Sequence, residues 1–120
     1  MQELVQAVRK AAKNPEIQLV RKTFGRPKGF LKKNKCCALS GVMCNSNVVM
    51  PLSTTGLFSK LGVADWIMSQ FNLSFDEISE FVNGWDHDDH TSLVSHELKS
   101  NVEFMAGYEL GRELIGGDDA

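Results

Sequence analysis

Apolar residues recur at helical spacing through much of this chain and outline its elements. The first element covers residues 2–13, where apolar positions alternate with polar ones until Asn14-Pro15 ends the run. This pattern predicts a helix, and its modest apolar face leads us to expect packing at the periphery of the fold. Its apolar positions are Leu4, Val5, Val8, Ala11 and Ala12.

The clearest pattern covers residues 62–86 and predicts two helices separated by the short break Asn72-Leu73-Ser74. The second helix opens with Ser74-Phe75-Asp76-Glu77, a capping box. In it the Ser74 hydroxyl accepts a hydrogen bond from the Glu77 backbone N–H, and the Glu77 carboxylate accepts one from the Ser74 N–H. Near the other end, Gly84 is well placed to terminate the helix in the left-handed conformation.

Two further helices are less sharply bounded. Residues 36–44 are apolar enough for a buried helix, and a buried strand is the weaker alternative because Ala and Gly are poor strand formers. The last helix begins near residue 93 or 97 and runs to residue 115. It contains Gly107 and Gly111, each costing about 1 kcal/mol relative to alanine, so we expect another helix to cross closely there. Residues 17–20 and 48–52 are too short to assign to helix, strand or loop.

Together these elements predict an all-α fold, a compact bundle of four or five helices that forms one domain over residues 1–120. Residues 21–35 hold two glycines, a proline and seven basic residues, so we expect a loosely ordered basic arm there. Residues 116–120 are expected to be a frayed tail. The predicted core comprises Val63, Trp66, Ile67, Phe71, Ile78, Phe81, Val82, Trp85, Phe104, Tyr108 and Leu114.

Charge divides the chain, although the formal net charge is only −2. Residues 1–35 carry ten Lys or Arg and two acids, a net charge of +8, whereas residues 36–120 carry three basic and thirteen acidic residues, a net charge of −10. Such a chain either folds its oppositely charged parts against each other or presents them to partners. Added salt should therefore lower the affinity of this protein for any partner that it binds through these charges.

The sequence pattern shows neither a membrane-spanning run nor a signal peptide, and this bears on the cellular compartment. No run of about 18 apolar residues is present, and the N-terminus mixes charged with apolar residues instead of forming a signal peptide. We therefore expect a soluble cytoplasmic protein that makes no membrane contact. The odd number of cysteines, Cys36, Cys37 and Cys44, fits a reducing compartment, and their apolar setting predicts buried, inert thiols.

Three short motifs together resemble a group of small uncharacterised helical proteins from bacteria and phages. They are Cys37-Ala38-Leu39 with Gly41, Leu73-Ser74 through Glu77 to Gly84-Trp85-Asp86, and Tyr108 with Gly111. The resemblance covers residues 36–115 and leaves the basic arm outside. It implies a compact helical fold in a bacterial or phage protein and carries no known activity. This chain departs from the pattern by a longer, His-rich insert after Gly84-Trp85-Asp86.

The densest polar cluster of the chain is Asp86-His87-Asp88-Asp89-His90. Imidazole and carboxylate ligands suit zinc, manganese, iron or nickel, and His96 could complete a ligand set. A solvated loop between helices is the simpler interpretation, because metal sites usually draw their ligands from separate elements. As an alternative function we therefore keep a divalent transition metal, held by Asp86, His87, Asp89, His90 and His96.

Nucleic-acid binding is a second alternative. The predicted helix pair over residues 62–83 looks like a helix-turn-helix, but its second helix carries Asp76, Glu77 and Glu80 without Lys or Arg, so phosphates would repel it. The basic arm is different, because lysines and glycines suit sequence-independent contacts to phosphates. Its predicted anion-binding residues are Arg21, Lys22, Arg26, Lys28, Lys32, Lys33 and Lys35.

The interpretation we favour is a non-enzymatic binding or regulatory module that contacts another protein through oppositely charged surfaces. No catalytic constellation stands out in the sequence, so we predict no catalytic residue and no required cofactor. Self-association stays open, because the apolar patch of residues 48–50 and the Gly107/Gly111 face could pack within the chain or across a homo-oligomer. The acidic surface expected for partner binding comprises Asp76, Glu77, Glu80, Asp86, Asp88, Asp89, Glu97, Glu103, Glu109 and Glu113.

Overall fold

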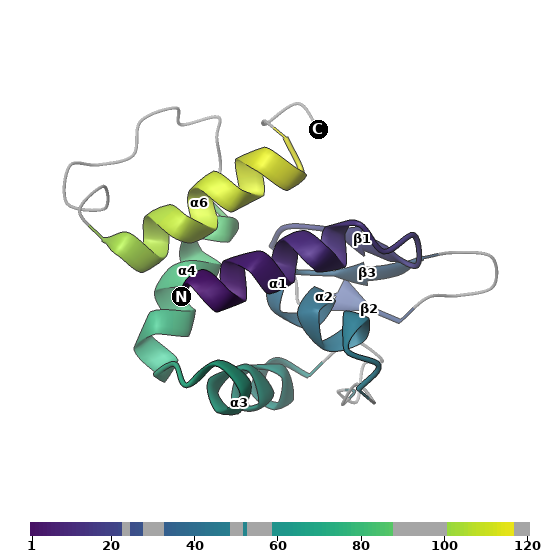
Figure 1. Cartoon of the computed structure of the whole chain (residues 1–120), viewed down its shortest axis with the longest axis horizontal. Helices are drawn as coiled ribbons and strands as arrows, with labels where there is room; N and C mark the ends of the chain where they lie inside the picture. Colours follow the sequence, from purple (N-terminus) through teal and green to yellow (C-terminus); the bar gives the residue numbers. More distant parts are fainter. Residues whose placement is uncertain (23–24, 28–32, 49–51, 53–58, 88–100, 117–120) are drawn as a thin grey trace.

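Helices make up most of the structure, as the sequence predicts. The computed structural model describes residues 1–22, 25–27, 33–48, 52, 59–87 and 101–116 (Figure 1). In this part of the chain the helices are α1 (Gln2–Ala12), α2 (Ala38–Asn45), α3 (Lys60–Phe71), α4 (Phe75–Trp85) and α6 (Val102–Leu114). The strands are β1 (Ile17–Leu19), β2 (Gly25–Arg26) and β3 (Asn34–Cys36).

A small three-stranded sheet is the feature that the all-α prediction lacks. Strand β3 lies in the middle, parallel to β1 and antiparallel to β2, so that Ile17 pairs with Asn34 and Gly25 with Cys36. The prediction of a loosely ordered arm over residues 21–35 is therefore wrong where β2 and β3 form. Strands of two or three residues have no detectable periodicity, and their partners lie far away in the sequence, so the pattern alone could not find them.

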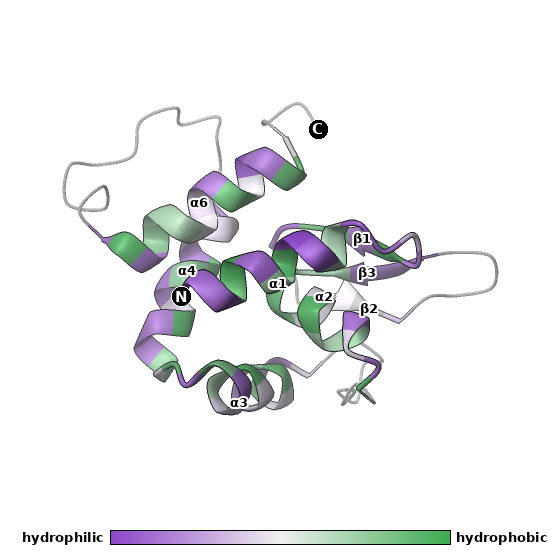
Figure 2. Ribbon diagram, in the orientation of Figure 1, coloured by the Kyte–Doolittle hydropathy of each residue, from purple (hydrophilic) through white to green (hydrophobic). Residues whose placement is uncertain are grey.

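Helix α1 is central, and the prediction that it packs at the periphery is wrong. Leu4, Val8 and Ala11 are fully buried, because α2 and β1 cover one side of α1 and α6 covers another (Figure 1). Hydrophobic and hydrophilic bands alternate along this helix in Figure 2. Contact with three elements thus lets a modest apolar stripe contribute to the main core.

The predicted core is otherwise confirmed. Seven of its members are buried, five in the main cluster and Phe104 and Tyr108 in a second, smaller one. The other four, Trp66, Phe71, Val82 and Leu114, are partly buried and pack against the main cluster. Cys36 and Cys37 are buried as expected, whereas Cys44 is only partly so. The largest fully buried side chains include Trp85 and Phe81 of α4.

The helix boundaries follow local capping chemistry. The Ser74 Oγ accepts from the Glu77 N–H at 3.1 Å and the Glu77 Oε1 accepts from the Ser74 N–H at 2.9 Å, which confirms the capping box. Helix α2 begins after Cys37, whose sulfur accepts from the Ser40 N–H. Helix α6 begins after Asn101, whose side chain accepts from the Phe104 N–H. The predicted starts at residues 93 and 97 lie outside the described residues.

Helices α4 and α6 cross in close contact, which explains two glycines. A Cβ on Gly107 would overlap the carbonyl oxygen of Phe81, and a Cβ on Gly84 would overlap that of Phe104. The close crossing expected at Gly107 is thus confirmed. The prediction that Gly84 ends α4 is wrong, since the helix continues to Trp85 and the glycine admits the backbone of α6.

Candidate functional site

The structure describes two of the predicted metal ligands, and each has its own contacts. The Asp86 Oδ1 accepts from the Lys22 backbone N–H at 2.6 Å. Burial raises the pKa of Asp86, opposed by that hydrogen bond and by the charges of Arg21 and Lys22. The His87 ring lies edge-on to Phe104 and Tyr108, with centroids 5.5 and 5.4 Å away.

The other predicted ligands, Asp89, His90 and His96, lie outside the described residues. Within the described ranges no group of three His, Cys, Asp or Glu side chains is arranged to hold a metal ion. The metal site therefore stays a prediction.

Arg21, one of the predicted anion-binding residues, forms hydrogen bonds to the ends of two helices. The guanidinium of Arg21 donates to the Trp85 carbonyl at 3.1 Å and to the Gly116 carbonyl at 3.0 Å, at the ends of α4 and α6. The Trp85 indole N–H donates in turn to the Val20 carbonyl at 2.9 Å. Arg21 thus ties the segment after β1 to both C-terminal helix ends.

The remaining basic residues are distributed over the sheet and its connections. Lys22, Lys33 and Lys35 are exposed, and Arg26 belongs to β2. Lys28 and Lys32 lie outside the described residues. A shared phosphate-binding surface formed by these residues stays a prediction.

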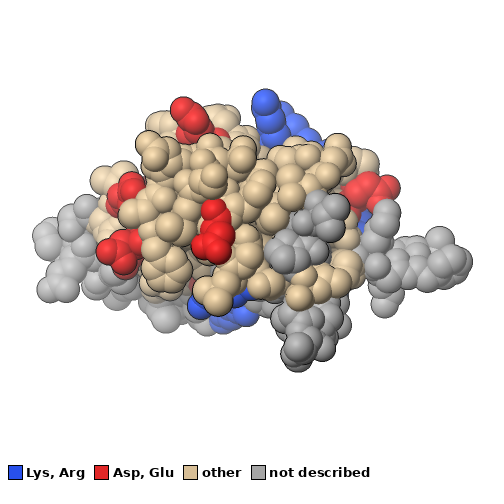
Figure 3. All heavy atoms as spheres, turned by 90° about the horizontal axis from the view of Figure 1, so that it is seen from below, with Lys and Arg blue, Asp and Glu red and all other residues tan. Residues whose placement is uncertain are grey.

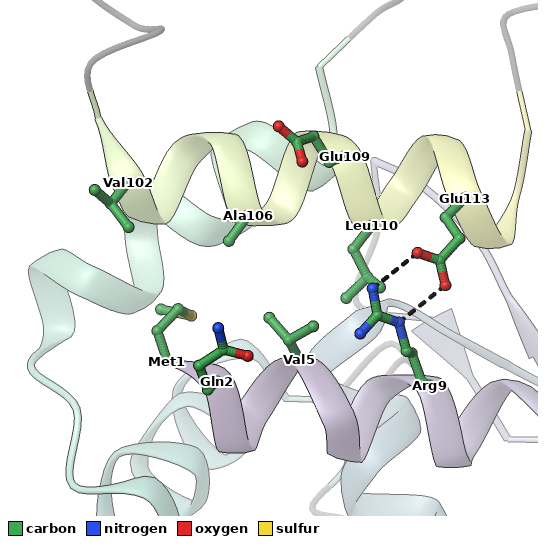
Figure 4. A pocket seen from close by; sticks show the side chains of 9 residues that line it. All are labelled: Met1, Gln2, Val5, Arg9, Val102, Ala106, Glu109, Leu110 and Glu113. Carbon is green, nitrogen blue, oxygen red and sulfur yellow. Dashed lines mark hydrogen bonds and ion pairs between the residues drawn. The ribbon is translucent and has the colours of Figure 1, made fainter.

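A groove lies between α1 and α6, lined by side chains of both helices (Figure 4). Its volume is about 380 Å³, close to the 360 Å³ of a hollow lined by α1 alone and larger than the 70 Å³ of the hollow between α3 and α4. Apolar side chains from both helices face it, and Val102 at its end is 70% exposed. The lining residues are Met1, Gln2, Val5, Arg9, Val102, Ala106, Glu109, Leu110 and Glu113.

An ion pair closes one end of this groove. The Arg9 guanidinium donates to both carboxylate oxygens of Glu113, each at 2.9 Å, as the dashed lines in Figure 4 show. This bidentate contact raises the pKa of Arg9 and lowers that of Glu113. Sequence reasoning missed the pair because the two residues are 104 positions apart and neither belongs to a motif.

The two walls of the groove differ in charge. The charged lining residue of α1 is Arg9, whereas those of α6 are Glu109 and Glu113. Acidic side chains are otherwise dispersed: on the face shown in Figure 3 they are separated by uncharged surface, with Lys and Arg near its margins. The groove is thus a place where the basic N-terminal part and the acidic C-terminal part of the sequence meet.

None of the described helices combines the length and the apolar character that a bilayer span requires. Comparison with protein-family models, with curated proteins and with solved structures finds no match to this chain.

Proposed function

We propose that this protein is a binding module whose α1–α6 groove holds an amphipathic helix of a partner protein. The observation that carries the proposal is the groove itself, which combines apolar side chains of both helices with the exposed carboxylate of Glu109 on the α6 wall. Helix-in-groove recognition uses these features, with apolar side chains at helical spacing as anchors and charges on either side.

The apolar part of the groove supplies affinity. Val5, Ala106 and Leu110 line it, and Val102 leaves a large apolar surface in contact with water. Apolar surface removed from water contributes about 25 cal/mol per Å². A volume of about 380 Å³ accommodates side chains rather than a whole helix, so the partner helix lies along the groove and inserts anchors spaced three or four residues apart.

The charged walls determine how the partner helix lies. Glu109 is exposed on the α6 wall and pairs with no cation among the described residues, while Glu113 is held by Arg9. A partner helix with Lys or Arg beside its apolar stripe would place these cations against Glu109. Such rim charges act mainly on orientation and on the association rate, and salt screens them.

Synthetic helical peptides test this proposal directly. One peptide carries a leucine stripe flanked by lysines, and a second has the same stripe flanked by glutamates. We expect fluorescence anisotropy to show tighter binding of the lysine peptide, with affinity falling as salt rises. Glu109→Lys should reverse the preference between the two peptides.

The chain offers a matched control for the apolar contact. Val102 is 70% exposed and lines the groove, whereas Leu61 in α3 is 69% exposed and does not. Val102→Asn should weaken lysine-peptide binding at least about tenfold, a change of about 1.4 kcal/mol, and Leu61→Asn should leave it unchanged. Equal effects of the two substitutions, or no preference between the peptides, would contradict the proposal.

A further inference from the structure

Two of the three cysteines lie next to each other in space. The sulfur atoms of Cys36 and Cys44 are 3.6 Å apart, and the Cys36 thiol donates to the Cys44 sulfur. Cys36 is the last residue of β3 and is fully buried, whereas Cys44 lies in the last turn of α2 and is only partly buried. The pair therefore combines a partly exposed cysteine with a fully buried one.

The packing of α2 on the sheet brings this pair together. A Cβ on Gly41 would lie 3.7 Å from the Cβ of Cys36, an ordinary contact, and 2.9 Å from the Cδ2 of Leu19, whose side chain would have to shift, so Gly41 lets the strands approach the helix closely. Since Cys36 precedes α2 and Cys44 lies two turns into it, this approach places both sulfur atoms on the side of α2 that faces the sheet.

The hydrogen bond makes the two thiols unequal. The Cys36 thiol lowers the pKa of Cys44 by stabilising its thiolate, and burial opposes this effect. The same hydrogen bond, helped by burial, raises the pKa of Cys36. Cys44 therefore loses its proton first, and since the thiolate is the nucleophile, Cys44 is the reactive member. Of the sequence-based prediction of buried thiols, the burial is wrong for Cys44, which is only partly buried.

Cys37 serves a different purpose, although it adjoins Cys36. Its sulfur accepts from the Ser40 backbone N–H at 3.5 Å and from the Ser40 hydroxyl at 3.6 Å, which caps α2. Burial raises its pKa, so its thiol stays protonated. Cys37 thus provides an internal control for the reactivity of the other two cysteines.

We propose that Cys36 and Cys44 form a site of reversible oxidation, in which a hydroperoxide converts the two thiols into a disulfide. The proposal rests on the contact between the two sulfurs and on the partial exposure of Cys44. It is independent of the groove between α1 and α6.

The reaction has two balanced steps. The Cys44 thiolate attacks one oxygen of the hydroperoxide and breaks the O–O bond, which yields a Cys44 sulfenic acid and, after uptake of a proton, water or an alcohol. The Cys36 sulfur then attacks the Cys44 sulfur; its proton and the Cys44 hydroxyl leave as water and the S–S bond forms. The peroxide gains the two electrons that the sulfurs lose, and a dithiol reductant restores both thiols.

The geometry requires little rearrangement. A disulfide has an S–S bond of about 2.05 Å, so the two sulfurs, now 3.6 Å apart, must approach by roughly 1.5 Å. The bond would tie the end of β3 to the last turn of α2. Because it restricts the unfolded chain, the oxidised protein should unfold at a higher temperature than the reduced protein.

Mass spectrometry of the full chain tests the proposal. Hydrogen peroxide at a small molar excess should lower the mass by two hydrogens. Maleimide labelling after denaturation should fall from three cysteines to one, and dithiothreitol should reverse both changes. Addition of oxygen without loss of two labelled cysteines would overturn the proposal, and so would an unchanged mass.

Variants identify which cysteines react. All three lie between Lys35 and Lys60, in one tryptic peptide, so Cys37→Ser is needed to separate Cys36 from its neighbour. This variant keeps an N-cap side chain, and we expect it to form the disulfide as the wild type does. Cys36→Ser should stop at a sulfenic acid that a cyclic dione traps, and Cys44→Ser should not react. Loss of the disulfide in Cys37→Ser, with its circular dichroism unchanged, would overturn the assignment.

Discussion

Replacing the glycines at the crossing of α4 and α6 should destabilise the protein strongly. In Gly107→Ala the new Cβ overlaps the Phe81 carbonyl oxygen and lies 2.9 Å from the Trp85 nitrogen; in Gly84→Ala it overlaps the Phe104 carbonyl oxygen and lies 2.8 Å from that carbonyl carbon. Carbon contacts are normally about 3.5–4.0 Å, so the helices must separate by roughly 1 Å.

The magnitude follows from two opposing effects. Alanine favours the helix over glycine by about 1 kcal/mol, while overpacking a core costs about 1–3 kcal/mol and occasionally more. Here the obstacle is backbone, which cannot rotate away, and α4 and α6 make the most extensive contact between the described elements. We expect a net loss of about 3 kcal/mol for each substitution, which lowers the melting temperature by about 10 °C.

Urea unfolding followed by tryptophan fluorescence measures this loss, because Trp85 is buried beside the crossing. Gly111→Ala is the matched control on the same helix. Its Cβ would meet the Trp85 oxygen at 3.2 Å and the Arg21 guanidinium at 3.3 Å, so a small shift suffices and stability should stay within about 1 kcal/mol of the wild type.

The double variant of Gly84 and Gly107 makes the test sharper. Once one alanine has separated the helices, the second meets less resistance, so the double variant should lose at least about 1 kcal/mol less than the sum of the single losses. Wild-type stability of Gly107→Ala, or equal losses in Gly107→Ala and Gly111→Ala, would refute the close crossing.

Three further predictions concern other contacts. Ser74→Ala removes the N-cap of α4 and should cost about 1 kcal/mol in urea unfolding. Trp85→Phe leaves the Val20 carbonyl without its indole donor and should cost about 2 kcal/mol in thermal unfolding; an unchanged melting temperature would show that water replaces the bond. Asp86→Asn tests the raised pKa of Asp86: the folded protein binds this proton more tightly than the unfolded chain, so stability is lost as pH rises through the raised pKa. Asparagine does not ionise, so the stability of the variant should rise relative to that of the wild type between about pH 3 and pH 7. A difference in stability that does not change with pH would contradict the raised pKa.

The helices and their ends were predictable because their determinants are local. A capping box needs only Ser74 and Glu77, three residues apart, and the apolar stripe of α4 repeats within a single helix. The glycine at residue 107 indicated a close crossing without identifying its partner. Gly84 shows the limit of such reasoning, since a glycine near a helix end is equally suited to terminate the helix and to admit a neighbour.

Contacts between distant segments depend on the tertiary structure alone. The groove requires α1 and α6 to lie side by side, and the Arg9–Glu113 pair spans 104 residues. The two thiols are only eight residues apart, but their contact depends on how α2 packs on β3. Strands β1 and β3 join residues 17 positions apart with too few residues to leave a pattern. Periodicity and capping thus determined which segments become helices, while the pairing of their faces, and with it the groove and its ion pair, was decided by packing between elements remote in the sequence.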